Sequence, residues 1–197
     1  MLETLASITA SALDKAASHE DVAEQATRDA LTGLVNRRAF ESELKAAAIG
    51  KRSTDASGVM FLDLDGFKKI NDEHGHKAGD EVLVETASRL LASVREGDTV
   101  ARLGGDEFTV LLRGVHDKGE AGIVAERILE AMRKPMRLST GVDVHPTPSL
   151  GVALALSSGA DATALLKNAD AAMYEAKRAG KDCWRMADDG LTMVVGQ

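Results

Sequence analysis

Cysteine, aromatic residues and long apolar stretches are all scarce in this sequence, and each shortage excludes a class of protein. The single cysteine, Cys183, cannot form an internal disulfide, which suits the reducing cytoplasm. No apolar run approaches the ~18 residues that cross a bilayer, and the N-terminus lacks the basic start and apolar stretch of a signal peptide. We therefore expect a cytoplasmic protein with no membrane segment. With aromatic residues at only 3%, leucine, valine, alanine and methionine must fill the core.

Basic residues are too few for a broad nucleic-acid-binding surface. Lysine and arginine total 24 against 31 aspartate and glutamate, so the formal net charge is −7. Binding a nucleic acid polymer needs clustered positive charge to neutralise phosphates, so we expect no such partner. The apolar content of 44% over 197 residues is nevertheless enough for one domain with a real core, and it excludes a wholly disordered chain.

Helical and strand-like hydrophobic patterns alternate from Asp29 onward. The predicted helices cover residues 36–48, 80–94, 119–132 and 160–178. The predicted strands cover residues 58–62, 99–103 and 107–112, with others within 142–156 and at Trp184. Pro146 and Pro148 indicate an edge or a bend. This order predicts an α/β fold of the α+β sandwich type, in which one sheet has helices on both faces.

The chain divides into three parts. Residues 28–187 carry the globular pattern, and residues 188–197 form a tail with no clear pattern. Residues 1–27 are rich in alanine, with apolar residues at helical spacing, and predict an N-terminal helix for linkage or dimerisation. This helix either packs against a partner chain or a missing upstream domain, or lies on its own domain, and we favour the first interpretation.

Two acids end the apolar run of residues 58–62. Because strand side chains alternate, Asp63 and Asp65 should project to one face and Leu64 to the other. Carboxylates at the end of a central strand are suitable ligands for a hard cation such as Mg²⁺. The backbone N–H groups of the following turn can cradle a phosphate at a helix start. Alternatively, Asp65 caps the next helix and Asp63 is a solvated strand end.

Two glycines and two more acids occupy a predicted hairpin turn. Gly104 and Gly105 allow a tight turn, and Asp106 and Glu107 then lie at its tip. An ordinary solvated turn would explain this motif on its own. If the two hairpin strands neighbour the strand that ends at Asp63, however, three or four carboxylates converge and need a cation. That arrangement is typical of two-metal phosphoryl-transfer sites.

The segment between these motifs holds candidate base-recognition residues. Asn71 and Asp80 could hydrogen-bond a planar base edge, and the adjacent N1 and N2 donors of guanine suit a carboxylate. The alternatives are a helix N-cap for Asp80 and a surface loop for His74 and His76.

Taken together, these segments resemble the GGDEF family of diguanylate cyclases, which join two GTP molecules into cyclic di-GMP. The resemblance covers about residues 28–185, and its motifs lie at residues 29–38, 63–68, 71–80, 104–108, 149–152 and 172–181. It implies a palm-like domain with a mostly antiparallel central sheet. It also implies an active cyclase that depends on Mg²⁺ or Mn²⁺ and works as a homodimer in which each half holds one GTP.

The resemblance also implies a role for each matching residue. The implied metal ligands are Asp63, the carbonyl of Leu64, Asp106 and Glu107. The implied catalytic groups are Asp106, which accepts the proton of the 3′-hydroxyl, and Lys68, which stabilises charge on the triphosphate. The implied substrate-binding residues are Gly66, Phe67, Lys68, Asn71, His76, Asp80, Lys177 and Lys181.

A second implied site lies just before the hairpin. Arg95 and Asp98 match the RxxD motif of the family, where the cyclic di-GMP product binds and inhibits the enzyme. Arg127 is our candidate for a second basic contact. The alternative is a helix-ending arginine followed by a turn aspartate. The stretch 1–17 resembles the last helix of a GAF-type sensor, which implies an upstream sensor domain. A catalytically silent receptor for GTP or cyclic di-GMP, and a palm-type cyclase acting on adenine nucleotides, are the other functions that we considered.

Overall fold

The computed structural model describes residues 27–49, 57–155 and 161–187. The tail of residues 188–197 and all but the last residue of the predicted N-terminal helix therefore lie outside the described residues. Among the described residues, no helix is both long and apolar enough to cross a bilayer.

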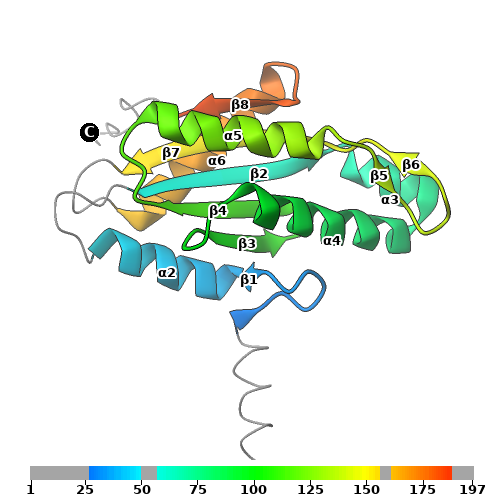
Figure 1. Cartoon of the computed structure of the whole chain (residues 1–197), viewed down its shortest axis with the longest axis horizontal. Coiled ribbons are helices and arrows are strands. Elements are labelled where there is room, and N and C mark those ends of the chain that lie inside the picture. Colours follow the sequence, from blue (N-terminus) through cyan, green and yellow to red (C-terminus); the bar gives the residue numbers. More distant parts are fainter. Residues whose placement is uncertain (1–26, 50–56, 156–160, 188–197) are drawn as a thin grey trace, which may run out of the picture.

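One six-stranded sheet, in the order β1-β3-β4-β2-β7-β8, forms the centre of the fold (Figure 1). Its strands are β1 (Val35–Asn36), β2 (Ser57–Asp65), β3 (Thr99–Gly104), β4 (Glu107–Arg113), β7 (Thr147–Ala155) and β8 (Cys183–Met186). The outer pairs β1–β3 and β7–β8 are parallel, and the three inner pairs are antiparallel. The predicted mostly antiparallel sheet is thus confirmed.

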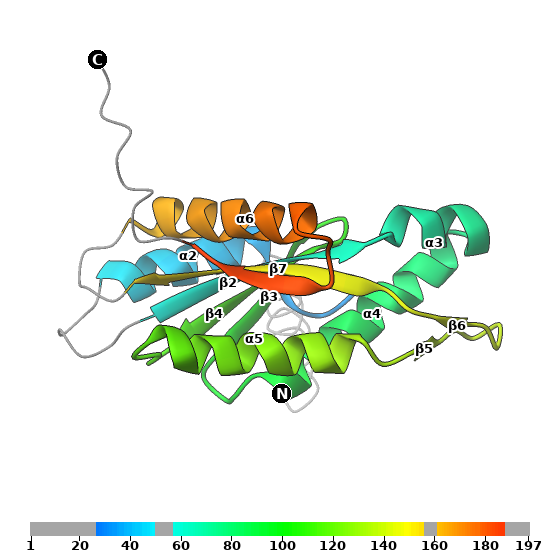
Figure 2. The ribbon, with the colours of Figure 1, turned by 90° about the horizontal axis from the view of Figure 1, so that it is seen from above.

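Helices cover both faces of this sheet, as predicted (Figure 2). Helices α2 (Arg37–Ile49) and α6 (Ala162–Arg178) pack on one face, and α4 (His76–Ser93) and α5 (Lys118–Met132) pack on the other. The short helix α3 (Phe67–His74) and the small hairpin of β5 (Met136–Arg137) and β6 (Asp143–Val144) extend beyond one end of the sheet.

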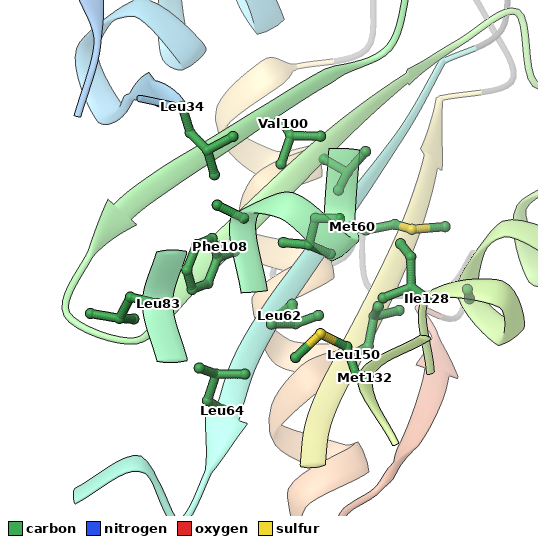
Figure 3. Packing of buried hydrophobic residues seen from close by; sticks show 14 of the residues in the cluster. Leu34, Met60, Leu62, Leu64, Leu83, Val100, Phe108, Ile128, Met132 and Leu150 are labelled. Atoms are coloured by element: carbon green, nitrogen blue, oxygen red, sulfur yellow. The ribbon is translucent and has the colours of Figure 1, made fainter. Parts of the chain in front are cut away.

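The alternation along β2 decides which side chains meet which helices. Met60, Leu62 and Leu64 enter the cluster on the α4 and α5 side, which Figure 3 shows around Phe108. The intervening Val59 and Phe61 enter the cluster on the α2 and α6 side. Most of the largest fully buried side chains are leucine, isoleucine and methionine, so the expected aliphatic core is confirmed.

Helix α6 lies unusually close to β7. A Cβ atom added to Gly151 of β7 would stand 2.0 Å from the carbonyl oxygen of Ala169 and 2.2 Å from the backbone nitrogen of Met173. Only a residue without a side chain allows this approach. Gly151 therefore sets the distance between the sheet and the helix that carries Lys177.

The predicted start of one helix needs correction. Helix α4 begins at His76 rather than at residue 80, because Gly75, with φ 83°, ends α3 and starts α4. Asp80 therefore lies inside a helix and is not its N-cap.

Strand β7 is internal to the sheet, but its pairing with β8 begins only at Ser149, so Pro148 still occupies a locally unpaired edge.

Candidate active site

The pairing of β2 with β4 brings acids from the two predicted motifs together. Asp63 is the register partner of Glu107, and Asp106 precedes Glu107 in the hairpin turn. Directly opposed residues on antiparallel strands have side chains on the same face, with Cβ atoms ~5 Å apart. The acids at 63 and 107 therefore lie side by side on the face of α2 and α6, and the charge of Asp106 in the adjoining turn acts on both of them. This is the predicted convergence.

Burial and a neighbouring like charge disfavour the ionised form of Asp63. Its pKa is raised chiefly by burial and also by the neighbouring Asp106, against the hydrogen bond from Lys177. The ammonium nitrogen of Lys177 lies 2.8 Å from Oδ2 of Asp63, and the charge of Lys181 also favours the ionised form. Two lysines thus offset part, but not all, of the cost of holding this charge.

Glu107 shows the same pattern. Its pKa is raised first by burial, and the charges of Asp63, Asp170 and Asp106 raise it further, while Arg37 opposes the shift. The Arg37 guanidinium stands 3.4 Å from the Glu107 carboxylate. It also donates a 3.1 Å hydrogen bond to the carbonyl of Leu103. Burial, together with the neighbouring carboxylates, therefore disfavours the ionised forms of Asp63 and Glu107, and a bound cation would offset that cost.

The donor atoms suit a divalent cation that is shared with a ligand. The predicted ligands offer only carboxylate and carbonyl oxygens, which hard cations prefer. In the described parts of the chain, no three acidic, histidine or cysteine side chains stand close enough to hold a metal ion by themselves. Mg²⁺ is usually bound by one or two carboxylates together with waters and substrate phosphates. The residues present fit that mode of binding rather than an all-protein cage.

Asp65, on the same face as Asp63, has a structural role instead. Its carboxylate accepts hydrogen bonds from the hydroxyls of Ser149 (3.0 Å) and Thr147 (3.3 Å) and from the backbone N–H of Asp182 (3.3 Å). It does not cap α3, whose N-cap is Gly66 in the left-handed conformation with φ 77°. The alternative that Asp65 is a helix cap is therefore wrong.

The predicted phosphate-binding residues surround the acids on two elements. Gly66 and Phe67 begin α3, so their N–H groups lie at a helix start as predicted, and Lys68 is exposed in the first turn. Lys177 lies in the last turn of α6. Lys181 lies beyond that helix, because Gly180, with φ 114°, follows its C-cap. The two lysines therefore approach Asp63 from different elements.

Asn71 and Asp80 lie on two helices that pack against each other, α3 and α4. The Asn71 amide lies so close to the α4 backbone that a Cβ atom at Gly79 would stand 2.0 Å from its Oδ1. Asp80 follows Gly79 and is exposed, and His76 is exposed at the start of α4. The structure thus places the predicted base-recognition residues on neighbouring helices.

Arg95 and Asp98 contact each other in the turn between α4 and β3. The Asp98 side chain is only 3% exposed, and it accepts hydrogen bonds from the backbone N–H groups of Arg95 (3.3 Å) and Arg113 (3.0 Å). The Arg95 side chain is 61% exposed. Both residues line a cavity of about 290 Å³ together with Arg127. Asp98 thus orders the turn, while the Arg95 guanidinium also donates to the carbonyls of Arg113 and Gly114, and Arg95 and Arg127 line the same cavity.

Sequence reasoning missed two arginines of the active site. Arg37 pairs with Glu107, as described above. Arg102 donates to the carbonyl of Gly105 from Nη2 (2.8 Å) and Nε (3.0 Å), and its Nη1 lies 3.0 Å from the Asp29 carboxylate. Burial raises the pKa of Asp29, but hydrogen bonds from Thr32 and Arg102 outweigh burial and lower it. The only available signal was the position of Arg102 two residues before the glycine pair.

Comparison with known proteins identifies the family. The profile of the family "Diguanylate cyclase, GGDEF domain" matches residues 26–183. The diguanylate cyclase TpbB of Pseudomonas aeruginosa is 42% identical over 189 residues, which are 95% of this chain and 43% of TpbB. The chain thus spans less than half the length of that relative.

Solved structures agree with this assignment. The GGDEF domain of TpbB, also called YfiN, superposes with a TM-score of 0.77 at 43% identity, over 82% of this chain and 94% of that domain. The coiled coil and GGDEF domain of DgcB from Caulobacter crescentus, in complex with c-di-GMP, superposes with a TM-score of 0.80 at 30% identity, over 94% and 99%. This chain therefore belongs to the GGDEF-domain diguanylate cyclase family.

Proposed function

We propose that this chain is a metal-dependent diguanylate cyclase that condenses two GTP molecules into cyclic di-GMP and pyrophosphate. The observation that supports it most directly is the register of Asp63 with Glu107, which brings them and Asp106 to one end of the sheet. Converging carboxylates whose ionised forms are disfavoured by burial and by one another match the need of phosphoryl transfer for a bound cation.

The proposed metal ligands come from Asp63, the carbonyl of Leu64, Asp106 and Glu107, with one or two of these carboxylates holding an ion together with waters and the substrate phosphates. When bound, Mg²⁺, or Mn²⁺ in its place, would offset phosphate charge and lower the pKa of the attacking 3′-hydroxyl. Asp106 accepts the proton of that hydroxyl as general base. No nucleophile from the protein is needed, because each 3′-hydroxyl attacks the α-phosphate of the other nucleotide, and one pyrophosphate leaves at each of the two steps.

The remaining groups of the site hold and orient GTP. Lys68 and the N–H groups of Gly66 and Phe67 bind the triphosphate at the start of α3. Lys177 exchanges its contact with Asp63 for the phosphates, and Lys181 joins it from the following turn. Asn71 and Asp80 hydrogen-bond the guanine edge, with His76 nearby.

Each chain carries one such set of residues, whereas the reaction joins two nucleotides. We therefore propose a homodimer in which each active site holds one GTP. The N-terminal residues 1–27 would supply a helix for dimerisation and for connection to an upstream sensor domain, with residues 28–187 as the catalytic domain in the cytoplasm and residues 188–197 as a tail. The charge of −7 argues against a nucleic acid polymer as a partner.

A product assay tests the proposed function. Incubation with GTP and Mg²⁺ should yield cyclic di-GMP and pyrophosphate, and Asp106→Asn should abolish both. The matched control is Asp143→Asn, which removes the charge of an exposed aspartate that pairs with Arg137 in the β5–β6 hairpin. Intact GTP after long incubation with dimeric protein would contradict the proposal. Tight nucleotide binding without turnover would instead indicate a silent receptor.

We further propose that cyclic di-GMP inhibits the enzyme by binding to Arg95 in the cavity that Arg127 also lines. The supporting observation is that two arginines line one cavity, and arginine binds phosphate in a bidentate manner. Arg95→Ala and Arg127→Ala should each raise the inhibition constant by about tenfold or more while leaving the initial rate near that of the wild type. An unchanged inhibition constant for Arg95→Ala would refute the site.

A further inference from the structure

The turn after α6 has an unusual backbone. Three consecutive residues have positive φ: Gly180 (114°), Lys181 (67°) and Asp182 (44°). Among the described residues, Lys181 and Asp182 are the only non-glycine residues with positive φ. Glycine adopts such angles freely, whereas other residues do so only where neighbouring contacts hold them.

The helix end explains only part of this turn. The N–H of Lys181 donates to the carbonyl of Ala176 (3.1 Å), and the N–H of Gly180 donates to the carbonyl of Lys177 (3.4 Å). This is the Schellman pattern, in which a single left-handed residue, usually glycine, ends the helix. The pattern requires Gly180 but gives no reason for the left-handed conformation of Lys181 and Asp182.

Contacts from two other elements hold Asp182. Arg133, the residue after α5, donates from Nε to both carboxylate oxygens of Asp182 (2.9 and 3.1 Å) and from Nη2 to its carbonyl (3.0 Å). Glu126 lies 3.6 Å from the same guanidinium. On the other side, the N–H of Asp182 donates to Asp65 at the end of β2 (3.3 Å). Asp182 is therefore restrained through its side chain, carbonyl and N–H at once.

Lys181 is the immediate neighbour of this restrained residue. Its charge reaches Asp63, whose ionised form it favours. An exposed lysine at the end of a free loop would sample many directions, at a cost in side-chain and backbone entropy on binding. The restraint at residue 182 removes much of the backbone part of that cost.

We propose that Arg133 is a positioning residue that clamps Asp182 in the left-handed conformation and thereby directs Lys181 toward the nucleotide phosphates. This inference rests on the proposed function, because it takes the triphosphate of GTP as the ligand of Lys181. The side-chain hydrogen bonds and ion pairs that Arg133 makes among the described residues are with Asp182 and Glu126. Arg133 directly follows α5, which packs on the face of the sheet opposite α6 (Figure 2).

The test compares two ligands that differ in their phosphates. We expect Arg133→Ala to weaken the binding of a GTP analogue with a non-cleavable α–β bridge by about five- to tenfold, the loss of one charge-assisted contact. Binding of GMP, which lacks the β- and γ-phosphates, should stay unchanged. Both affinities are measured by calorimetry in Mg²⁺, and thermal unfolding checks that the variant is folded. A general structural defect would weaken both ligands alike.

Three further variants make the test specific. Arg178→Ala removes one positive charge from an exposed pair with Glu175 on α6 and should leave both affinities unchanged. Arg133→Lys should restore part of the GTP-analogue affinity, because one donor replaces the bidentate group. Asp182→Gly removes the carboxylate that Arg133 holds and should weaken binding of the GTP analogue as Arg133→Ala does. This variant should fold even if Arg133→Ala does not, because glycine adopts φ 44° without strain.

A double-mutant cycle separates this proposal from the proposed function. If Arg133 acts through Lys181, then Arg133→Ala adds no further loss in a Lys181→Ala background. Additive losses, equal losses for GMP, or wild-type affinity of Arg133→Ala would overturn the clamp while leaving the cyclase assignment in place. Wild-type affinity of Lys181→Ala would overturn the phosphate role of Lys181, and the clamp with it.

Discussion

Gly79→Ala should impair guanine recognition without unfolding the domain. The new Cβ atom would stand 2.0 Å from Oδ1 and 2.9 Å from Cγ of Asn71, and 3.2 Å from Cζ of Phe67. The first two distances are impossible for real atoms, so the Asn71 side chain must rotate away. It can do so, because the clash involves the end of a flexible side chain rather than the backbone.

Two opposing effects set the magnitude. In a helix interior, alanine is favoured over glycine by about 1 kcal/mol, and this gain should offset the cost of displacing Asn71. We therefore expect the free energy of unfolding to change by less than about 1 kcal/mol. The lost hydrogen bond from Asn71 to guanine is worth about 1 kcal/mol, so GTP should bind about five- to tenfold more weakly, and discrimination against ATP should fall.

The assay pairs nucleotide affinity with urea unfolding for Gly79→Ala, Asn71→Ala and the double variant. In the Asn71→Ala background the clash is gone, so Gly79→Ala should stabilise the domain by about 1 kcal/mol and cause no further loss of affinity. Undiminished GTP affinity in Gly79→Ala, together with weakened binding in Asn71→Ala, would refute the steric argument. Undiminished affinity in both would refute the role of Asn71.

Three other variants test the site and its support. Asp63→Asn should abolish turnover yet raise the stability of the nucleotide-free protein near neutral pH. Because the pKa of Asp63 is raised in the folded state, the stability of the wild type falls as the pH rises above the ordinary aspartate value of 3.8. The stability gained by the substitution should therefore shrink as the pH falls toward 3.8. A gain independent of pH in urea unfolding would contradict this. Gly151→Ala should cost about 3 kcal/mol or more, since its Cβ would meet backbone atoms of α6 that cannot rotate away; an unchanged urea midpoint would show that α6 moves freely. Arg102→Ala should cost about 1–3 kcal/mol in stability and lower kcat more than it raises KM, because it frees the carbonyl of Gly105 beside Asp106; an unchanged kcat would exclude a positioning role.

The active-site acids illustrate how far local patterns reach. The period of two along β2 correctly predicted that Asp63 and Asp65 share a face. It could not predict their different roles, because the partners of each aspartate come from other strands and helices. Asp65 meets the hydroxyls of Ser149 and Thr147, whereas Asp63 meets Lys177 and lies opposite Glu107. These partners follow from sheet order and register.

The sequence by itself determined the strand–turn–helix motifs, the two-glycine hairpin, the aliphatic core and the family, because each depends on neighbouring residues and the fixed periods of helix and strand. Only the tertiary structure decided which charges meet: Arg102 with Asp29, Arg133 with Asp182, and Lys177 with Asp63. The partners are 73 residues apart for Arg102 and Asp29, 49 apart for Arg133 and Asp182, and 114 apart for Lys177 and Asp63. Their contacts arise when separate elements pack around one sheet, and no local period encodes that packing.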